Sequence, residues 1–152
     1  MTDSVLTPER ILAAAEDVLR RYGPGKATVV DVAQALGVSH GSVYRHFASK
    51  AALREAVLQG WLARSMAPLQ TIANSRTPPP ARLRQWFSTL RQTKRDNVLG
   101  DPELFATYSA LAAEAGEAIA EHKARMQQQI ASILAAGVAS GDFRPLDPPA
   151  AA

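Results

Sequence analysis

The segment from Thr28 to Lys50 constrains the fold more than any other part of this 152-residue chain. It holds two short runs of apolar residues at helical spacing, separated by a tight glycine-containing link. Thr28 can cap the first run, and Asp31, three residues later, can return a bond to the cap in a capping box. Gly37 can take the left-handed conformation that ends a helix, and Ser39 can cap the next one. We therefore predict two helices joined by a tight turn.

The second predicted helix is short and offers few side chains to a core. Only Val43 and Phe47, four residues apart, are large and apolar enough to hold it in place. The other positions carry hydrogen-bonding side chains or the bare glycine Gly41, and Ser49 can start a third helix just beyond. Such an arrangement is the helix-turn-helix pattern, in which the second helix lies in a major groove of DNA.

The composition of the rest of the chain also favours helices. Hydrophobic residues make up 47% of the sequence and no strand pattern occurs, so we expect an all-α fold. There is no cysteine, which excludes disulfides and a cysteine-based zinc site. We find neither the pattern of a signal peptide nor an apolar run long enough for a membrane, and we expect a cytoplasmic protein without membrane contact.

The net charge of +3 mildly favours a polyanionic partner. The excess does not lie in the helix-turn-helix region, because residues 1–60 hold seven basic and six acidic side chains. The net charge therefore does not establish DNA binding. Only the types and positions of individual residues in the helix-turn-helix segment can indicate it.

Local signals place the helices of the N-terminal half. Thr7 and Pro8 begin a helix that Gly23 stops, and the helix from Ser49 should kink or end at Pro68. The side chains expected to face inward are Ile11, Ala15, Val18, Leu19, Tyr22, Leu53, Ala56, Val57, Gly60, Trp61 and Arg64.

Three helices are expected in the C-terminal half. The proline-rich segment 75–80 breaks the chain, and an amphipathic helix follows that ends in the basic run 91–95. Gly100 is a stop, Asp101 a cap and Pro102 a first helical position, and the last helix runs to about Gly141. The inward side chains should be Leu83, Trp86, Phe87, Leu90, Leu104, Tyr108, Leu111, Ala115, Ile119, Met126, Ile130, Ile133, Leu134 and Val138.

On these residues the chain resembles the tetracycline-repressor (TetR) family of bacterial transcriptional regulators. The resemblance covers residues 7–62, and its most specific part is Gly37-Val-Ser39, Gly41-Ser-Val-Tyr-Arg-His-Phe47 and Ser49-Lys50, in the family's order without gaps. It implies a three-helix DNA-binding domain at residues 1–48 and a helical ligand-binding and dimerisation domain at residues 49–152. Members usually repress as homodimers on palindromic operator DNA, and a small-molecule effector releases them.

One departure concerns the end of the chain. In the family, a segment like Gly141-Asp-Phe-Arg144 usually leads into two more helices that form the dimer interface. Here eleven residues follow Gly141. Either the protein dimerises through other helices, or the chain is a truncated regulator. The alternative function is a helical interaction protein that no longer pairs or binds an operator.

The resemblance also implies roles for residues of the helix-turn-helix. Lys50 and Tyr44 would contact phosphates, with Thr28 and His46 as helpers, and such contacts carry no sequence information. Base reading would fall to His40, Gly41, Ser42 and Arg45, since this fold places the first turn of the second helix against the base edges, and the cap residue Ser39 belongs to the same DNA-binding set. Gly41 would let the backbone approach the bases, and Ser42 can donate to or accept from any base.

An enzymatic interpretation is rejected. Gly37-Val-Ser-His-Gly41 matches the nucleophile elbow of serine hydrolases, but that elbow follows a strand, and here the preceding residues favour a helix. His122 has no Glu-x-x-His partner and is interpreted as a surface histidine. We expect no catalytic residue, no metal and no cofactor.

The effector site is the least specified part of the sequence. Large apolar residues at helical spacing are more often core than pocket. The subset predicted to line a cavity for a small-molecule effector is Trp86, Phe87, Phe105, Tyr108 and Met126.

Overall fold

A computed structural model of the chain describes residues 5–145 and shows only helices in that range. These helices are α1 (Pro8–Tyr22), α2 (Val29–Leu36), α3 (His40–Tyr44), α4 (Lys50–Ala73), α5 (Pro79–Gly100), α6 (Pro102–Glu114) and α7 (Gly116–Ala139). The all-α prediction is confirmed. Residues 1–4 and 146–152, which the two expected domains include, lie outside the described range.

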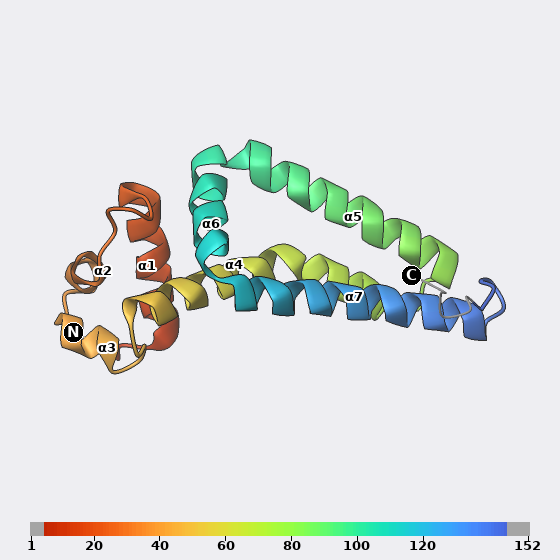
Figure 1. The fold of residues 1–152 in the computed structure, drawn as a ribbon, viewed down its shortest axis with the longest axis horizontal. Helices are drawn as coiled ribbons and strands as arrows, with labels where there is room; N and C mark the ends of the chain where they lie inside the picture. The colour runs from red at the N-terminus through yellow and green to blue at the C-terminus, as the bar shows by residue number, and fades with distance from the viewer. Residues whose placement is uncertain (1–4, 146–152) are drawn as a thin grey trace.

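The helices form two groups that share α4 (Figure 1). Helices α1 to α3 gather around the first half of α4, and α5 and α7 extend along its second half. Helix α6 lies across the junction and contributes Tyr108 and Leu111 to the same buried cluster as Ile11, Val43 and Val57. A second cluster, which we call the distal cluster, consists of Leu69, Ala73, Trp86 and Ile133. The core of the helix-turn-helix is therefore continuous with α6.

Side-chain caps begin five of the helices where the sequence indicates them. The Thr28 hydroxyl accepts a hydrogen bond from the Asp31 amide at 3.1 Å, and the Thr28 amide donates to the Asp31 carboxylate at 2.9 Å, which completes the capping box. Gly37 ends α2 in the left-handed conformation, with φ +67°. The capping side chains of the other four helices are Thr7, Ser39, Ser49 and Asp101.

Two helix ends differ from the expectation. Helix α4 does not end at Pro68 but continues to Ala73. Proline removes one hydrogen bond, but Leu69 and Ala73 of the following turn are buried in the distal cluster, which keeps that turn helical. Helix α5 runs past the basic segment 91–95 to Gly100, because the first stop signal comes only there.

Four of the side chains expected inward are exposed: Tyr22, Arg64, Phe87 and Val138. Tyr22, in the last turn of α1, is 47% exposed, because Leu19 and Ala27 fill the core at that end. Val138, near the end of α7, is 38% exposed. The neighbouring residue Gly137 is buried instead, because the ring of Phe143 packs against it.

Within residues 5–145, no helix combines the length and the apolar character that crossing a membrane requires.

Candidate nucleic-acid interface and effector cavity

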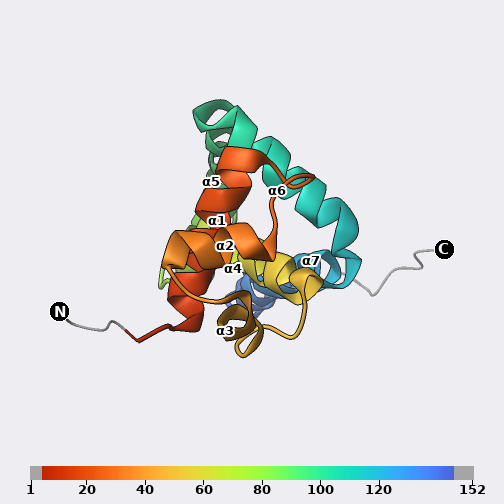
Figure 2. The same ribbon diagram turned by 90° about the vertical axis from the view of Figure 1, so that its left-hand side faces the viewer.

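Helix α3, the predicted recognition helix, is attached to the molecule by one side. Val43 is buried at 1% exposure, and Phe47 just beyond the helix packs against the same cluster. The Ser39 hydroxyl caps the helix by accepting from the Ser42 amide at 3.3 Å. Figure 2 looks onto this end of the molecule and shows α3 at its edge. The prediction that α3 buries Val43 and packs Phe47 inward is confirmed.

The other side of α3 faces solvent. His40, Gly41, Tyr44, Arg45 and His46 are exposed. The rings of His40 and Tyr44 meet edge to face, with centroids 6.4 Å apart, so each restricts the other. The helix therefore presents an ordered polar surface.

Two residues of the predicted base-reading set, Ser42 and Gly41, have surroundings that bear on their roles. Ser42 is half-buried, and its hydroxyl lies 2.9 Å from that of Ser39, so one of its hydrogen-bonding positions is already used. A Cβ atom on Gly41 would meet only the Ser39 hydroxyl oxygen, at 3.9 Å. The fold itself leaves room for a side chain at Gly41, which makes the glycine consistent with close approach by an outside partner.

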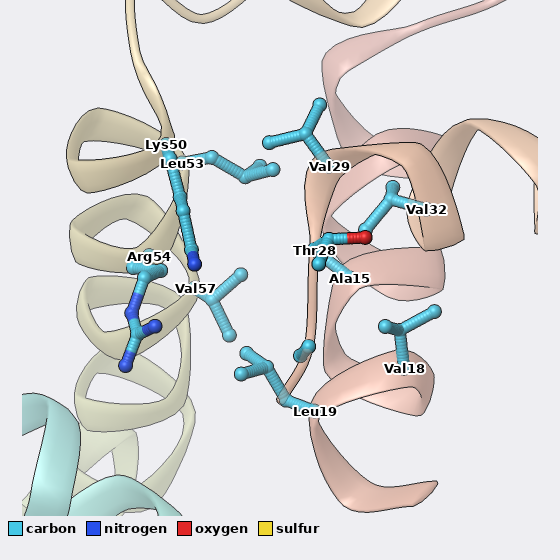
Figure 3. A pocket seen from close by; sticks show the side chains of 11 residues that line it. Ala15, Val18, Leu19, Thr28, Val29, Val32, Lys50, Leu53, Arg54 and Val57 are labelled. Carbon is cyan, nitrogen blue, oxygen red and sulfur yellow. The ribbon is translucent and has the colours of Figure 1, made fainter. Parts of the chain in front are cut away.

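Two of the predicted phosphate contacts, Thr28 and Lys50, lie where helices begin, whereas Tyr44 is the last residue of α3. Thr28 caps α2 and Lys50 opens α4, and both line one small cavity of about 20 Å³ (Figure 3). That volume holds about one water molecule, so the cavity is no ligand site. The first turns of α2 and α4 are thus adjacent, and the Lys50 side chain extends from the start of α4 along that helix (Figure 3). The Thr28 hydroxyl, however, donates to Asp31 at 2.7 Å and is engaged within the capping box.

The five residues predicted to line an effector cavity do not gather in one place. Trp86 belongs to the distal cluster and Tyr108 to the cluster around the helix-turn-helix. Phe87 is 49% exposed beside a shallow groove on α5, and Phe105 is half-buried on α6. Only Met126 lines the cavity between α4 and α7.

This cavity between α4 and α7 has a volume of about 180 Å³, and we call it the α4–α7 cavity. Its lining consists of Gln59, Leu62, Ala63, Met66, Ala67 and Gln70 from α4 and Ala118, His122, Arg125, Met126 and Gln129 from α7. At one end, the Gln129 amide donates to Gln70 at 2.9 Å and its oxygen accepts from the indole of Trp86 at 2.8 Å. Glutamine side chains therefore join α4, α5 and α7 beside the cavity.

His122 corrects the expectation of a surface histidine. It is half-buried and lines the α4–α7 cavity. Burial, together with the positive charges of Arg125 and Lys94, lowers the pKa of its imidazole. The sequence did hold a signal for this site, because His122, Arg125 and Gln129 recur at helical spacing on a face that also carries Met126.

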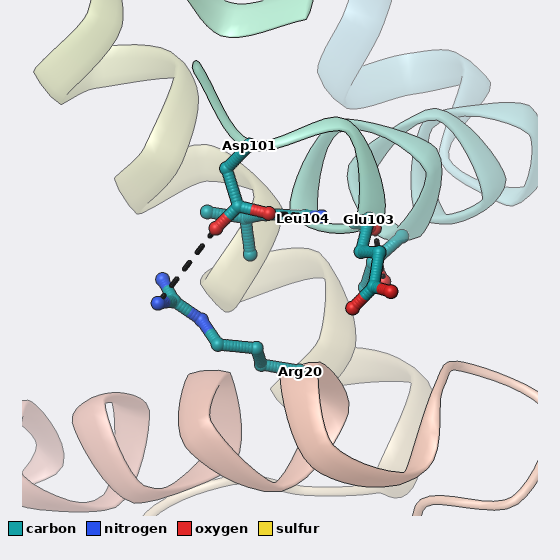
Figure 4. Close-up of polar contacts among 5 residues, drawn as sticks. Arg20, Asp101, Glu103 and Leu104 are labelled. Atoms are coloured by element: carbon teal, nitrogen blue, oxygen red, sulfur yellow. Dashed lines mark hydrogen bonds and ion pairs between the residues drawn. The ribbon is translucent and has the colours of Figure 1, made fainter. Parts of the chain in front are cut away.

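Polar contacts connect the N-terminal helices to α6. Arg20 on α1 pairs with Asp101 at 3.8 Å, while Asp101 also caps α6 by accepting from the Leu104 amide at 3.0 Å (Figure 4). Arg54 on α4 donates to the Pro24 carbonyl at 2.8 Å and pairs with Glu114 at 3.5 Å. These contacts could not be predicted from the sequence, because the residues that form them are far apart in the chain.

The ring of Tyr108 strengthens this junction. It stacks on Trp61 with centroids 4.4 Å apart, and burial, with the nearby carboxylate of Glu16, raises the pKa of its phenol. Glu16 itself pairs with Arg64 at 2.7 Å. Helix α6 is thus attached to both α1 and α4.

Comparisons with known proteins agree with this architecture. Residues 11–57 match the family described as bacterial regulatory proteins, tetR family, and residues 79–152 match the tetracyclin repressor-like C-terminal domain. Over 52 residues the chain is 38% identical to the HTH-type transcriptional regulator TtgR of Pseudomonas putida. That match covers 34% of this chain and spans only a quarter (25%) of the curated relative.

Solved structures extend the likeness to most of the chain. The TetR family transcriptional regulator PfmR from Thermus thermophilus is 25% identical, with a TM-score of 0.61 over 91% of this chain and 75% of that chain. A TetR transcription regulator from Haloarcula marismortui shares the fold at 23% identity, with a TM-score of 0.70 over 92% and 74% of the two chains. With both family domains matched around the observed helix-turn-helix, the chain belongs to the tetracycline-repressor family of bacterial regulatory proteins.

Proposed function

We propose that this protein is a transcriptional repressor that binds a roughly palindromic operator as a homodimer in the cytoplasm. Residues 1–48 are its DNA-binding domain, and residues 49–152 are its regulatory and dimerisation domain. A small-molecule effector releases it from DNA. The observation that carries the proposal is the exposed polar face of α3, a helix anchored by the buried Val43 alone.

Different residues of this surface have different tasks. His40, Gly41, Ser42 and Arg45 meet base edges in the major groove, with Ser39 holding the first turn in place. Tyr44 and Lys50 contact phosphates on either side, assisted by Thr28 and His46. Lys50 stands at the positive end of the α4 dipole, where a phosphate offsets the unfavourable placement of a cation.

The effector binds in the α4–α7 cavity. Helix α4 begins with Lys50 at the DNA-binding end and lines the cavity from Gln59 to Gln70, so one helix spans both sites. A ligand that separates α4 from α7 also acts on α6, which is attached to α1 through Arg20 and Asp101. Effector binding therefore changes the position of α3 relative to its partner in the dimer.

Selection from a pool of random duplex DNA tests the proposal. The full chain should enrich a site with two half-sites about one helical turn, or a multiple of it, apart. Gly41→Val should abolish this enrichment, because a side chain there blocks backbone approach. Gly100→Val is the matched control, since a Cβ at Gly100 meets nothing within 4 Å and the residue ends α5, a helix that lies away from α3 (Figure 1). Enrichment of the same site by Gly41→Val protein would contradict the proposed interface.

Sedimentation velocity tests the homodimer separately. We expect a dimer at micromolar protein concentration. A monomer that also fails to enrich DNA would favour the alternative of a helical interaction protein.

A further inference from the structure

The α4–α7 cavity has an electrostatic character that the proposed function does not by itself specify. Among the described residues that line it, none is a carboxylate, whereas His122 and Arg125 bring basic nitrogen atoms. Helix α4 contributes only uncharged side chains, of which Gln59 and Gln70 are polar. The cavity is thus a partly apolar site whose charged groups are all of one sign.

A third basic group comes from α5. Lys94 lies close enough to His122 to disfavour its protonation, as Arg125 does. Within residues 5–145, the one carboxylate that pairs with these groups is Glu121, which lies 3.6 Å from Arg125 in an exposed i, i+4 pair. Exposed pairs of this kind are weak, so the positive potential is largely uncompensated. Helix α5 adds to it, since it carries five basic residues and one acidic residue.

The imidazole of His122 and the thioether side chain of Met126 lie at different positions along the cavity. Helices α4 and α7 lie side by side and run in the same direction (Figure 1), held together at Gln70 and Gln129. Along this axis His122 precedes Met126 by one turn, and Met66 lies on the facing helix. A ligand therefore meets the His122 imidazole toward the α6 end and the thioether of Met126 one turn nearer the Gln129 end.

The volume limits the size of the ligand. About 180 Å³ is slightly more than an engineered cavity of about 150 Å³ that holds benzene. It is smaller than the roughly 300–1,000 Å³ of sites for drug-sized molecules. A single ring, or a short alkyl chain, with one small charged group fills it.

We propose that the α4–α7 cavity binds a small organic monoanion, a carboxylate with one aromatic ring or a short alkyl chain. The carboxylate is held by His122 and Arg125 under the field of Lys94, and the apolar body lies against Leu62, Met66 and Met126. The inference rests on the proposed function in taking this cavity as the effector site, and it names the chemical class of the effector.

Binding of such an anion takes up a proton. The free His122 is mostly neutral near pH 7, because its pKa lies below the ordinary value. A bound carboxylate favours the imidazolium form and raises this pKa. Affinity is therefore highest below the pKa of the free protein and falls as the pH rises through the pKa of the complex. The other charged groups that act on His122 are Lys94 and Arg125, and the side chains that α4 brings to the cavity are uncharged.

Calorimetric titration of the full chain with three probes of similar shape tests the proposal. Benzoate is the anion, benzyl alcohol the neutral control and benzylamine the cationic control. We expect benzoate to bind at least about tenfold more tightly than either control, and more tightly at about pH 6 than at about pH 8. Equal affinity for the three probes, preference for benzylamine, or no binding of either benzoate or hexanoate at millimolar concentration would overturn the proposal.

Variants locate the site. Arg125→Gln and His122→Gln should each weaken benzoate binding about tenfold, whereas Lys123→Gln, which removes an exposed charge from the same helix, should leave it unchanged. A proton NMR titration of the wild-type imidazole gives a readout that does not depend on variant stability. Benzoate should raise the pKa of His122, and an unchanged pKa would place the anion elsewhere and refute the assignment.

The DNA selection described above separates this inference from the function on which it rests. If the chain enriches a DNA site but binds benzoate and benzyl alcohol with equal affinity, the proposed DNA-binding function stands and the proposed anionic effector is refuted. If benzoate binds at His122 but the chain enriches no DNA site, the proposed anion site stands and the proposed repressor function is refuted.

Discussion

The two ends of the molecule are built differently. At the DNA-binding end, α1 to α4 all begin with a side-chain cap, and each of α1, α2 and α4 buries several apolar residues. At the distal end, α5 and α7 begin without a side-chain cap. Of the 22 residues of α5, only Pro79 and Trp86 are buried. A large cluster of buried side chains holds one end in a defined shape, whereas the four residues of the distal cluster hold the other.

This difference suits two tasks. Under the proposed function, a surface that reads DNA needs fixed positions for side chains such as Tyr44 and Lys50, because base and phosphate contacts tolerate little displacement. A site that responds to a ligand needs helices that can move by small amounts, and such elements come from the less stable part of a protein.

The largest change in stability is expected at Trp86, the largest side chain of the distal cluster. Trp86→Ala removes a fully buried side chain and its hydrogen bond to Gln129, and should cost about 3–5 kcal/mol of unfolding free energy. Phe87→Ala, at the exposed neighbouring position, should cost much less. Hydrogen exchange should show lost protection in α5 and α7 and retained protection in α1 to α3. Equal loss at both ends would contradict the division into two regions.

The second prediction concerns the packing of α7 near its end. A Cβ atom on Gly137 would overlap the ring of Phe143, so Gly137→Ala should destabilise the chain by about 1–3 kcal/mol in urea unfolding. Gly116→Ala, at an open position of the same helix, is the control and should not be destabilising. A destabilisation of the same size in both would show that the Phe143 contact is not the cause.

The third prediction tests the capped end. Thr28→Ala removes the hydroxyl half of the capping box, while the backbone amide at position 28 can still donate to Asp31, and it should cost about 1 kcal/mol. Thr71→Ala, which removes an exposed hydroxyl within α4, should change stability far less. An equal cost for both would mean that the cap adds nothing to the rigidity of the helix-turn-helix.

The smallest effect is expected at a single phosphate contact. Lys50→Gln should weaken DNA binding several-fold on every sequence and reduce the salt slope by about one. Lys123→Gln, at the distal end, should leave both quantities unchanged. An altered base preference in Lys50→Gln protein would show that Lys50 reads bases instead of contacting phosphate.

Local signals account for most of what could be predicted. Thr7, Thr28, Ser39, Ser49 and Asp101 cap the helices that the sequence assigns to them, because a cap acts over three residues of the same chain. Tyr22 and Val138 show the limit of this reasoning. Their spacing places them on an apolar face, but only packing decides which residue at the edge of that face is covered.

The candidate sites divide in the same way. The exposure of His40, Tyr44 and Arg45 follows from the sequence, since Val43 and Phe47 leave α3 one inward face. The domain boundary at residue 48 and the roles of the DNA-binding residues remain predictions. The effector cavity could not be read from apolar spacing, because Trp86, Phe87 and Tyr108 point to different parts of the molecule.

The sequence alone thus determined the helices, the turn between α2 and α3, and the family, because all of these depend on neighbours within a few residues. The tertiary structure alone decided that α6 packs on the helix-turn-helix and that His122 and Arg125 face a cavity also lined by Gln59 and Met66. Such contacts join residues far apart in the chain, as Gln70 and Gln129 are, 59 positions from each other. Side-chain packing between helices selects them, and no local pattern encodes that selection.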